Sequence, residues 1–259
     1  FLYLNAVMVP GPQRSHGPVA VLRAVAARSG LRLPSELCVA LEKGCLAVDV
    51  DLQPGLVDVG LALLKEAPSG VPQIMIYAGT PVSLDDPGYM SKVHAVRRRS
   101  GGFEGRAAQE ALAVRVVGAL GSYTNWRASQ LALLDLTGLR LSRPDIVQRL
   151  SSSLASCSCL ARLSLSHCRL GDQGLAALAP ALGAGMPALS CLSLAHNSLE
   201  SSAAVRKLLQ RRTGALRRRA VVRGVAVVPL AVLDLSGHPR FGAGVGECVA
   251  AAVAREVEQ

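Results

Sequence analysis

Three stretches of the sequence repeat a single pattern: LALLDLTGLRL at residues 131–141, LARLSLSHCRL at residues 160–170 and LSCLSLAHNSL at residues 189–199. Leucine occupies the first, fourth, sixth and eleventh positions of each stretch, and the ninth position holds leucine, cysteine or asparagine. Each stretch begins 29 residues after the one before it. Because the spacing and the offset are both constant, the stretches are copies of one structural unit.

This spacing and length are typical of leucine-rich repeats, in which each unit supplies a short strand and a helix. A single unit cannot bury its apolar side alone, so neighbouring units stack. We therefore predict an α/β fold: a right-handed leucine-rich-repeat solenoid with a parallel concave sheet and outer helices. A fourth copy begins at Leu230. In this fold Leu134, Leu163, Leu192 and Leu233 are expected to lie side by side on neighbouring parallel strands.

The sequence divides into two parts. Residues 128–259 hold the regular copies, and residues 1–127 hold weaker strand–helix units that we interpret as degenerate repeats. Periodicity disappears over residues 78–105, where we expect a long loop that is functional or disordered. Residues 121–127 are expected to connect a helix to the first regular copy. The expected helices are residues 17–27, 34–41, 55–65, 106–120, 144–155, 172–182, 201–210 and 242–256, and the expected early strands are residues 48–52 and 74–76.

Composition limits the classes of partner. Half of the residues are hydrophobic but only 3% are aromatic, so the core must be built from Leu, Ala and Val. The net charge of +10 favours acidic partners such as nucleic acid, anionic membrane or acidic protein tails, without selecting among them. The seven cysteines mostly fall on apolar faces, which is typical of reduced thiols in a cytoplasmic protein. No apolar run is long enough for a membrane span, and we expect no membrane partner.

The polar residues between the repeated leucines form the first candidate site. Side chains alternate along a strand, so these residues are expected on the concave face, with equivalent positions ~4.8 Å apart. Such a face could bind a protein or could simply be solvated. The predicted protein-binding residues are Asp135, Thr137, Arg162, Ser164, Ser166, His167, Ser193, His196, Asp234 and Ser236.

Two histidines and an asparagine occupy repeated positions. His167 and His196 are equivalent, so we expect their rings to be stacked neighbours. Zinc normally needs three or four ligands, and Cys168 and Asn197 should point inward, so we predict no metal site and no cofactor. Asn197 is expected to satisfy backbone groups of the turn instead.

The second candidate site is a basic insertion at about residues 211–228, which separates the third and fourth copies and lengthens the preceding helix. The stretch contains no acidic residue and no aromatic residue of the kind that stacks on bases. We expect it to bind an acidic partner, such as a tubulin tail, with nucleic acid as the alternative and a solvated helix extension as the simplest case. The predicted acidic-partner-binding residues are Arg206, Lys207, Arg211, Arg212, Arg217, Arg218, Arg219 and Arg223.

Motifs of catalysis are missing from the sequence. It contains no G-x-S-x-G, no phosphate-binding P-loop, no HExxH and no GxGxxG motif. Glycines at residues 242–246 only approximate a phosphate loop and fall where a repeat's turn belongs. We therefore predict that the chain is not an enzyme and has no catalytic residues.

A resemblance sharpens these expectations. The segment LARLSLSHCRLGDQGLAALAPAL (residues 160–182) resembles the ribonuclease-inhibitor class of leucine-rich repeat. LPSELCVALEKGCLAVDVDL (residues 33–52), the regular copies, the late insertion and LAVLDLSGHPRFGAGVGECVAAAVA (residues 230–254) follow in an order similar to that of the seventy-eight-kilodalton centrosomal protein family. The insertion here is short and dense in arginine. The resemblance covers about residue 35 to the C-terminus.

If the chain shares the properties of that family, it acts without catalysis in centriole and cilium assembly. The resemblance implies a place in the cytoskeleton at the centrosome, centriole or ciliary basal body, with links to ubiquitin-ligase machinery. Two alternatives stay open: a basic adaptor of a nucleic-acid or ribonucleoprotein complex, and an inhibitor-like adaptor of a small cytosolic enzyme. Another ciliary or axonemal leucine-rich-repeat protein would carry the same motifs.

Overall fold

The structure is a computed structural model that describes part of the chain. The described residues are 18–28, 30, 32, 38, 45–49, 57–62, 73–77, 106–127 and 131–238. The loop expected over residues 78–105 and the helix expected over residues 242–256 lie outside them, as does most of the helix expected over residues 34–41.

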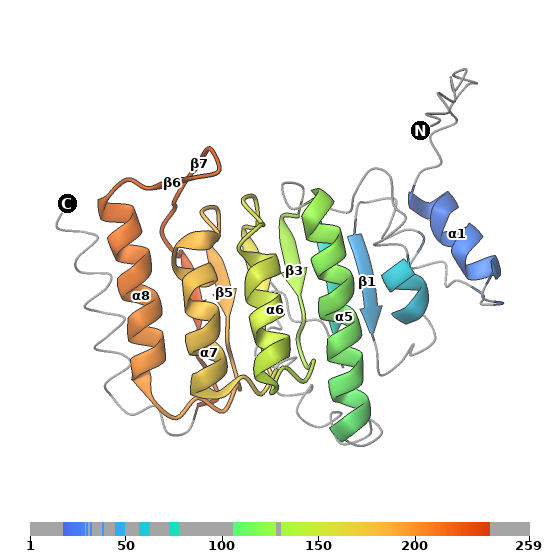
Figure 1. Cartoon of the computed structure of the whole chain (residues 1–259), viewed down its shortest axis with the longest axis horizontal. Helices are drawn as coiled ribbons and strands as arrows, with labels where there is room; N and C mark the ends of the chain where they lie inside the picture. Colours follow the sequence, from blue (N-terminus) through green and yellow to red (C-terminus); the bar gives the residue numbers. More distant parts are fainter. Residues whose placement is uncertain are drawn as a thin grey trace, which may run out of the picture.

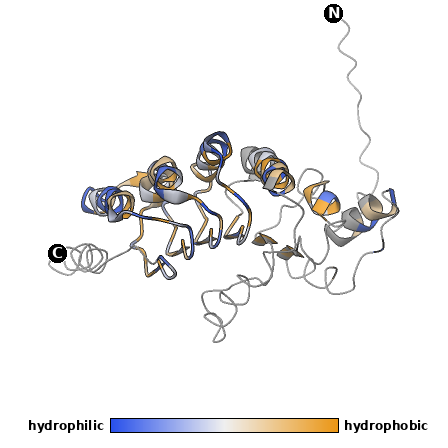
Figure 2. Ribbon diagram, turned by 90° about the horizontal axis from the view of Figure 1, so that it is seen from below, coloured by the Kyte–Doolittle hydropathy of each residue, from blue (hydrophilic) through white to orange (hydrophobic). Residues whose placement is uncertain are grey.

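Within the described part of the chain, strands and helices build an α/β structure around one parallel sheet. The strands are β1 (Cys45–Asp49), β2 (Gln73–Tyr77), β3 (Leu133–Asp135), β4 (Arg162–Ser164), β5 (Cys191–Ser193) and β8 (Val232–Asp234), in that order across the sheet. The helices are α1 (Pro18–Arg28), α5 (Arg106–Arg127), α6 (Pro144–Leu154), α7 (Gly171–Pro180), a π-helix (Ala181–Gly185) and α8 (Ser202–Arg217). Helices α5 to α8 pack against one another in sequence order (Figure 1) and lie on the same side of the strands (Figure 2).

One apolar residue from each strand lines up with its equivalent on the next strand. Leu134 pairs with Leu163, Leu163 with Leu192 and Leu192 with Leu233, all in parallel register, so the expected alignment is confirmed. The same row continues into the N-terminal strands, where it is completed by Leu46 and Ile74. We call these six residues the aliphatic row; all are at most 2% exposed except Leu233, which is half-buried.

The N-terminal strands depart slightly from the expected boundaries. Strand β1 begins at Cys45, three residues before the expected start, and buries Leu46 and Val48. Leu46 precedes Val48 by two residues, so the alternation seen from Val48 onward also extends backward. Alternation alone therefore did not locate the start of the strand. Residues 57–62 are helical, within the expected helix, and β2 contains the expected strand.

Helix α5 corrects one expectation. It continues through residues 121–127, which were expected to be a connector. A glycine ends a helix when it adopts the left-handed conformation after the last turn. Gly121 stays helical, and Ser122 donates its hydroxyl to the Gly118 carbonyl at 3.3 Å within the helix. The buried residues Val117 and Leu120 fix this part of the helix against the core.

Helices α6, α7 and α8 begin within one residue of the expected positions, and the starts of α6 and α8 have identifiable causes. In α6, Pro144 occupies the first turn, where its missing N–H costs nothing, and Asp145 complements the positive end of the helix. In α8, Ser201 caps the helix by accepting a hydrogen bond from Ala203 N at 3.1 Å. Helix α8 ends at Arg217, seven residues beyond its expected end at residue 210. The insertion therefore lengthens this helix, as expected.

Asn197 fills its expected structural role. Its Oδ1 accepts hydrogen bonds from Cys168 N at 2.9 Å and Leu170 N at 3.4 Å. Its Nδ2 donates to the carbonyls of Leu165 at 2.6 Å and Leu194 at 2.9 Å. One fully buried amide therefore satisfies backbone groups in two consecutive turns and holds them together.

Replacing Leu163 or Leu192 by alanine is expected to lower the free energy of unfolding by about 2–5 kcal/mol, because each change leaves a cavity in the aliphatic row. Chemical denaturation followed by circular dichroism measures this. Gln173→Ala, at an exposed position of α7, is the control and should change stability by no more than about 0.5 kcal/mol. Unaltered unfolding of both leucine variants would show that the row is wrongly assigned.

Candidate functional site

The strand-side candidate residues are less accessible than expected. Five of the ten are buried: Asp135, Thr137, Ser164, Ser166 and Ser193. These five side chains therefore offer little surface to a partner, which corrects the expectation of an open polar face at their positions.

Mutual hydrogen bonding explains their burial. Thr137 Oγ1 lies 2.8 Å from Ser164 Oγ, which lies 3.4 Å from Ser166 Oγ. Ser166 Oγ lies 2.6 Å from Ser193 Oγ, and Ser193 donates to Asp234 Oδ2 at 3.1 Å. These residues, which we call the hydroxyl chain, connect β3, β4, β5 and β8. The side chains satisfy one another, so they can be withdrawn from water.

Both aspartates of this face also hold the backbone. Asp135 Oδ1 accepts a hydrogen bond from Thr137 N, and Asp234 Oδ1 accepts one from Ser236 N, each at 2.9 Å. A side-chain carboxylate that binds the N–H two residues later stabilises a turn at the end of a strand. These carboxylates therefore have a structural role at the ends of β3 and β8.

The remaining strand-side candidates are at least partly exposed, although the atoms Ser236 Oγ and His196 Nε2 are themselves buried. Arg162 is exposed, and His167, His196, Asp234 and Ser236 are partly exposed. The row that contains Arg162 also contains Val232, which is 39% exposed. A partner on this side of the sheet would therefore meet one cation, imidazole rings and some apolar surface.

The expected histidine stack is confirmed. The rings of His167 and His196 are 4.3 Å apart between centroids and 10° from parallel. Both residues have left-handed backbones, with φ of 57° and 55°, and Gly237 follows at the equivalent position with φ of 74°. A Cβ atom on Gly237 would come within 2.0 Å of the His196 ring, so only glycine fits there. Face-to-face rings direct their nitrogens along parallel planes and do not converge on one metal ion.

His238 lies beyond the stack. The side chain is 7% exposed, and its Nδ1 lies 3.1 Å from the Ser236 carbonyl, where the Nδ1–H tautomer would donate. Burial lowers the pKa of His238 below its ordinary value, and the neighbouring His196 acts in the same direction. Asp234 and Asp172 oppose this shift. The neutral ring is therefore favoured in the folded protein.

The basic candidate site separates into exposed cations and one buried cation. Seven of its eight residues are exposed: Arg206, Lys207, Arg211, Arg217, Arg218, Arg219 and Arg223. Arg212 is only 1% exposed and is therefore not part of the surface, contrary to the expectation that it contacts a partner. We call the seven exposed residues the basic surface.

Arg212 instead binds backbone carbonyls. Its Nη1 donates to Met186 O at 2.8 Å, its Nη2 to Pro187 O at 3.1 Å and its Nε to Val228 O at 3.0 Å. Further hydrogen bonds reach the carbonyls of Leu182 and Leu189. The guanidinium group thus joins α8 to the segment before β5 and to the segment before β8. Arg212 lies four residues after Leu208 and three before Ala215, which are both buried. This spacing places the three residues on one side of the helix and is the sequence signal for the burial of Arg212.

The insertion also contains a hairpin that the sequence analysis missed. Strands β6 (Val221–Val222) and β7 (Val225–Ala226) pair antiparallel and form a separate two-stranded sheet. Arg223 and Gly224 make the turn with φ of 52° and 80°. Arg223-Gly224 between Val221-Val222 and Val225-Ala226 is the signal that would have revealed it, because a residue followed by glycine between short apolar pairs favours a hairpin turn.

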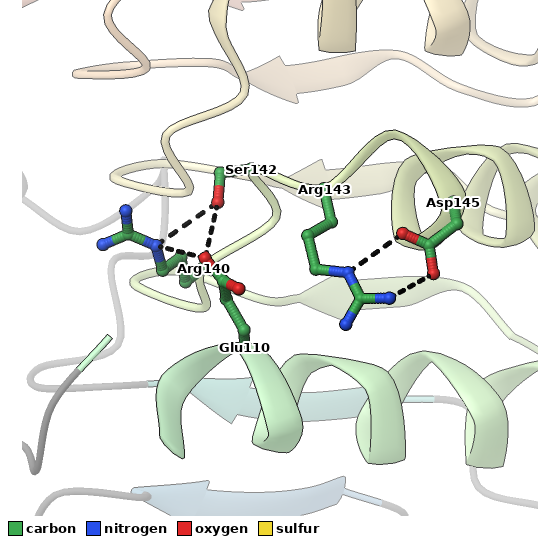
Figure 3. A network of polar contacts seen from close by, with 5 residues as sticks. All are labelled: Glu110, Arg140, Ser142, Arg143 and Asp145. Carbon is green, nitrogen blue, oxygen red and sulfur yellow. Dashed lines mark hydrogen bonds and ion pairs between the residues drawn. The ribbon is translucent and has the colours of Figure 1, made fainter. Parts of the chain in front are cut away.

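Two arginines near α5 and α6 are paired with carboxylates, unlike most cations of the basic surface. Arg140 Nε lies 3.2 Å from Glu110 Oε1, and Arg143 binds both carboxylate oxygens of Asp145 at 3.0 and 2.8 Å (Figure 3). The Arg143 guanidinium holds the pKa of Asp145 below its usual value.

Six residues of the basic surface have no carboxylate partner among the described residues: Lys207, Arg211, Arg217, Arg218, Arg219 and Arg223. Residues 201–228 also contain no acidic residue that could neutralise them locally. Their positive charge is therefore directed to solvent and remains available to an anionic partner.

Cys38, Cys157, Cys159, Cys168 and Cys191 have free thiols. Burial raises the pKa of Cys157 to about 12, and burial also raises the pKa of Cys168. Both thiols are therefore protonated near neutral pH and fill space as small apolar groups.

The sequence matches no protein-family model, and no curated protein matches it. Among the described residues, no group of three His, Cys, Asp or Glu side chains is arranged to hold a metal ion. None of the helices in this part of the chain combines the length and the apolar character needed to cross a bilayer. The function is therefore inferred from the basic surface and from the partly exposed strand side.

Replacing Arg212 by methionine is expected to destabilise the protein by about 3 kcal/mol or more, because several buried carbonyls lose their donor. Lys207→Met removes the same charge from an exposed position of α8 and should cost no more than about 0.5 kcal/mol. Urea denaturation of both variants makes the comparison. Equal stability of the two would contradict the structural role of Arg212.

Stability is expected to fall as the pH drops below 6.5, the ordinary pKa of histidine. The folded protein holds His238 at a lower pKa, so below 6.5 the unfolded chain binds more protons than the folded one. The stabilising contribution is complete above 6.5 and is lost as the pH falls towards the folded pKa.

Thermal unfolding at about pH 7.5 and about pH 5.5 measures this loss. His238→Asn, which retains a donor for the Ser236 carbonyl, should show a smaller decrease in Tm than the parent protein. A decrease of the same size in both proteins would rule out His238 as its source.

Proposed function

We propose that this chain is a leucine-rich-repeat protein of the ribonuclease-inhibitor type that acts as a non-catalytic scaffold for an acidic protein partner. The proposal includes a right-handed solenoid with outer helices, in which each copy adds one strand and one helix. The aliphatic row supports it, because copies 29 residues apart place Leu134, Leu163 and Leu192 at the same register on successive parallel strands.

The basic surface is the observation that carries the choice of partner. Seven exposed cations lie along α8 and the β6–β7 hairpin, in a stretch without acidic residues. Lys207 and Arg211 are four residues apart and share one side of α8, and Arg218 follows directly after the last residue of the helix. An acidic protein segment supplies the negative charges that complement these cations.

A place at the centriole or basal body follows from the resemblance to the centrosomal family. The partners expected there include acidic tubulin tails, other centriolar proteins and components of ubiquitin-ligase machinery. The six cations of the basic surface without a carboxylate partner among the described residues suit the acidic tails of a cytoskeletal polymer. Tagged protein expressed in ciliated cells should mark centrioles if this part of the proposal holds.

Nucleic acid is the second candidate, and the same cations favour it. Residues 201–228 contain no aromatic side chain, however, whereas proteins that hold single strands commonly stack bases on aromatic rings. Binding through phosphate contacts alone would be steeply dependent on salt and indifferent to sequence.

A charge-reversal variant tests the proposed function. Changing Lys207, Arg211 and Arg218 to glutamate is expected to abolish pull-down of an acidic tubulin-tail peptide. The matched control changes Arg23, Arg32 and Arg149 to glutamate, because these exposed cations lie elsewhere and the change in net charge is the same. The control should bind as the parent does.

Binding should weaken between about 50 mM and about 300 mM salt, as expected for exposed charges. RNA added as a competitor separates the two candidates. Tail binding that survives excess RNA supports the acidic-protein partner, while preferential binding of RNA supports the alternative. Equal loss of binding in the variant and its control would contradict a specific role for the basic surface.

A further inference from the structure

The β6–β7 hairpin exposes an apolar face among cations. Val221 is opposite Ala226, and Val222 is opposite Val225. Directly opposite residues lie on the same face of a hairpin, and consecutive residues lie on opposite faces. Val222 and Val225 are partly buried, whereas Ala226 is exposed and Val221 is 63% exposed. The outward face of the hairpin therefore presents aliphatic side chains to solvent.

Two arginines of this segment adopt an unfavourable backbone. Arg219 and Arg223 have φ of 47° and 52°, in the left-handed region that Gly and Asn enter more easily. In a tight hairpin turn followed by glycine, asparagine is the preferred residue at the position of Arg223. Residues with a strained backbone are concentrated at sites where their side chains serve a function. Arginine at these two positions therefore costs stability that glycine or asparagine would not.

The hairpin is held firmly at its base. Ala220 N donates to Ala215 O at 3.0 Å, and Val227 N donates to Ala220 O at 3.0 Å. Val228 N donates to Pro187 O at 2.9 Å, and the buried Arg212 binds the Val228 carbonyl. Because these hydrogen bonds fix the hairpin, it loses little conformational freedom when a partner binds, which favours affinity.

We propose that the hairpin and the end of α8 form a docking site for an acidic peptide segment that carries an aliphatic side chain. The acidic groups contact Arg217, Arg218, Arg219 and Arg223, and the aliphatic group packs on Val221. Charge complementarity selects the acidic segment, and the exposed valine selects a segment with an apolar anchor over a purely acidic tail. The inference rests on the proposed function and specifies the partner's motif.

Two labelled peptides test the docking site by fluorescence polarisation with the full chain. One is a run of glutamates interrupted by a single leucine, and the other has serine in place of that leucine. The leucine peptide is expected to bind about fivefold or more tightly, as burial of an aliphatic group provides. Val221→Ser should remove this difference and leave the affinity for the serine peptide unchanged. Val232→Ser, at an exposed valine of β8 outside the hairpin, is the control and should retain the difference.

Arg223→Asn separates binding from folding. It removes one cation and relieves the left-handed backbone, so the Tm should stay constant or rise while the affinity for both peptides falls about threefold. Retention of the leucine preference in Val221→Ser, with binding still lost on reversing the charges at Lys207, Arg211 and Arg218, would overturn the docking site and preserve the proposed function. Binding of an RNA oligonucleotide or of anionic lipid vesicles, without binding of either peptide, would overturn both.

Discussion

Burial of one aliphatic side chain from every strand, in a single parallel register, is the constraint on which the rest of the structure depends. When Leu163 lies between Leu134 and Leu192, every other repeated position must also lie beside its equivalent. The same register brings together the hydroxyl groups of Thr137 and Ser164 and stacks two imidazole rings. The polar contacts on the far side of the sheet are therefore consequences of the apolar row.

The basic insertion interrupts this regularity without breaking it. The fourth copy starts 41 residues after the third, yet Leu192 and Leu233 keep the register of the earlier pairs. The additional residues are absorbed by the longer α8 and by the β6–β7 hairpin. Arg212 makes this arrangement stable, because one buried guanidinium group satisfies carbonyls before β5 and at the end of the insertion. The same segment thus supplies the buried arginine that stabilises the fold and the seven exposed cations of the basic surface.

Sequence reasoning predicted the features that depend on repetition. The parallel sheet, the alignment of leucines, the histidine stack and the role of Asn197 all follow from a constant offset. It failed where a local pattern had two readings. The alternation around Val48 did not fix the start of β1, and Gly121 did not end α5.

The candidate sites were harder to predict than the fold. A run of cations suggests a solvated face, and only the spacing to Leu208 and Ala215 indicates that Arg212 is inside. Small hydroxyl side chains look like surface residues until their neighbours are known, because burial depends on pairing across strands and not on residue type. The hairpin was hidden because its strands have two residues each, too few for a periodic pattern.

Disulfide mapping of the register tests the central claim most directly. Arg162 is the registered partner of Cys191 on the neighbouring strand, so oxidation of an Arg162→Cys variant should join the introduced thiol to Cys191. A cysteine introduced at Ala161, one residue out of register, should form this bridge far more slowly, as peptide mapping by mass spectrometry would show. Bridging at equal rates from both positions, or from Ala161 alone, would contradict the single register from which the sheet and the surfaces described above are built.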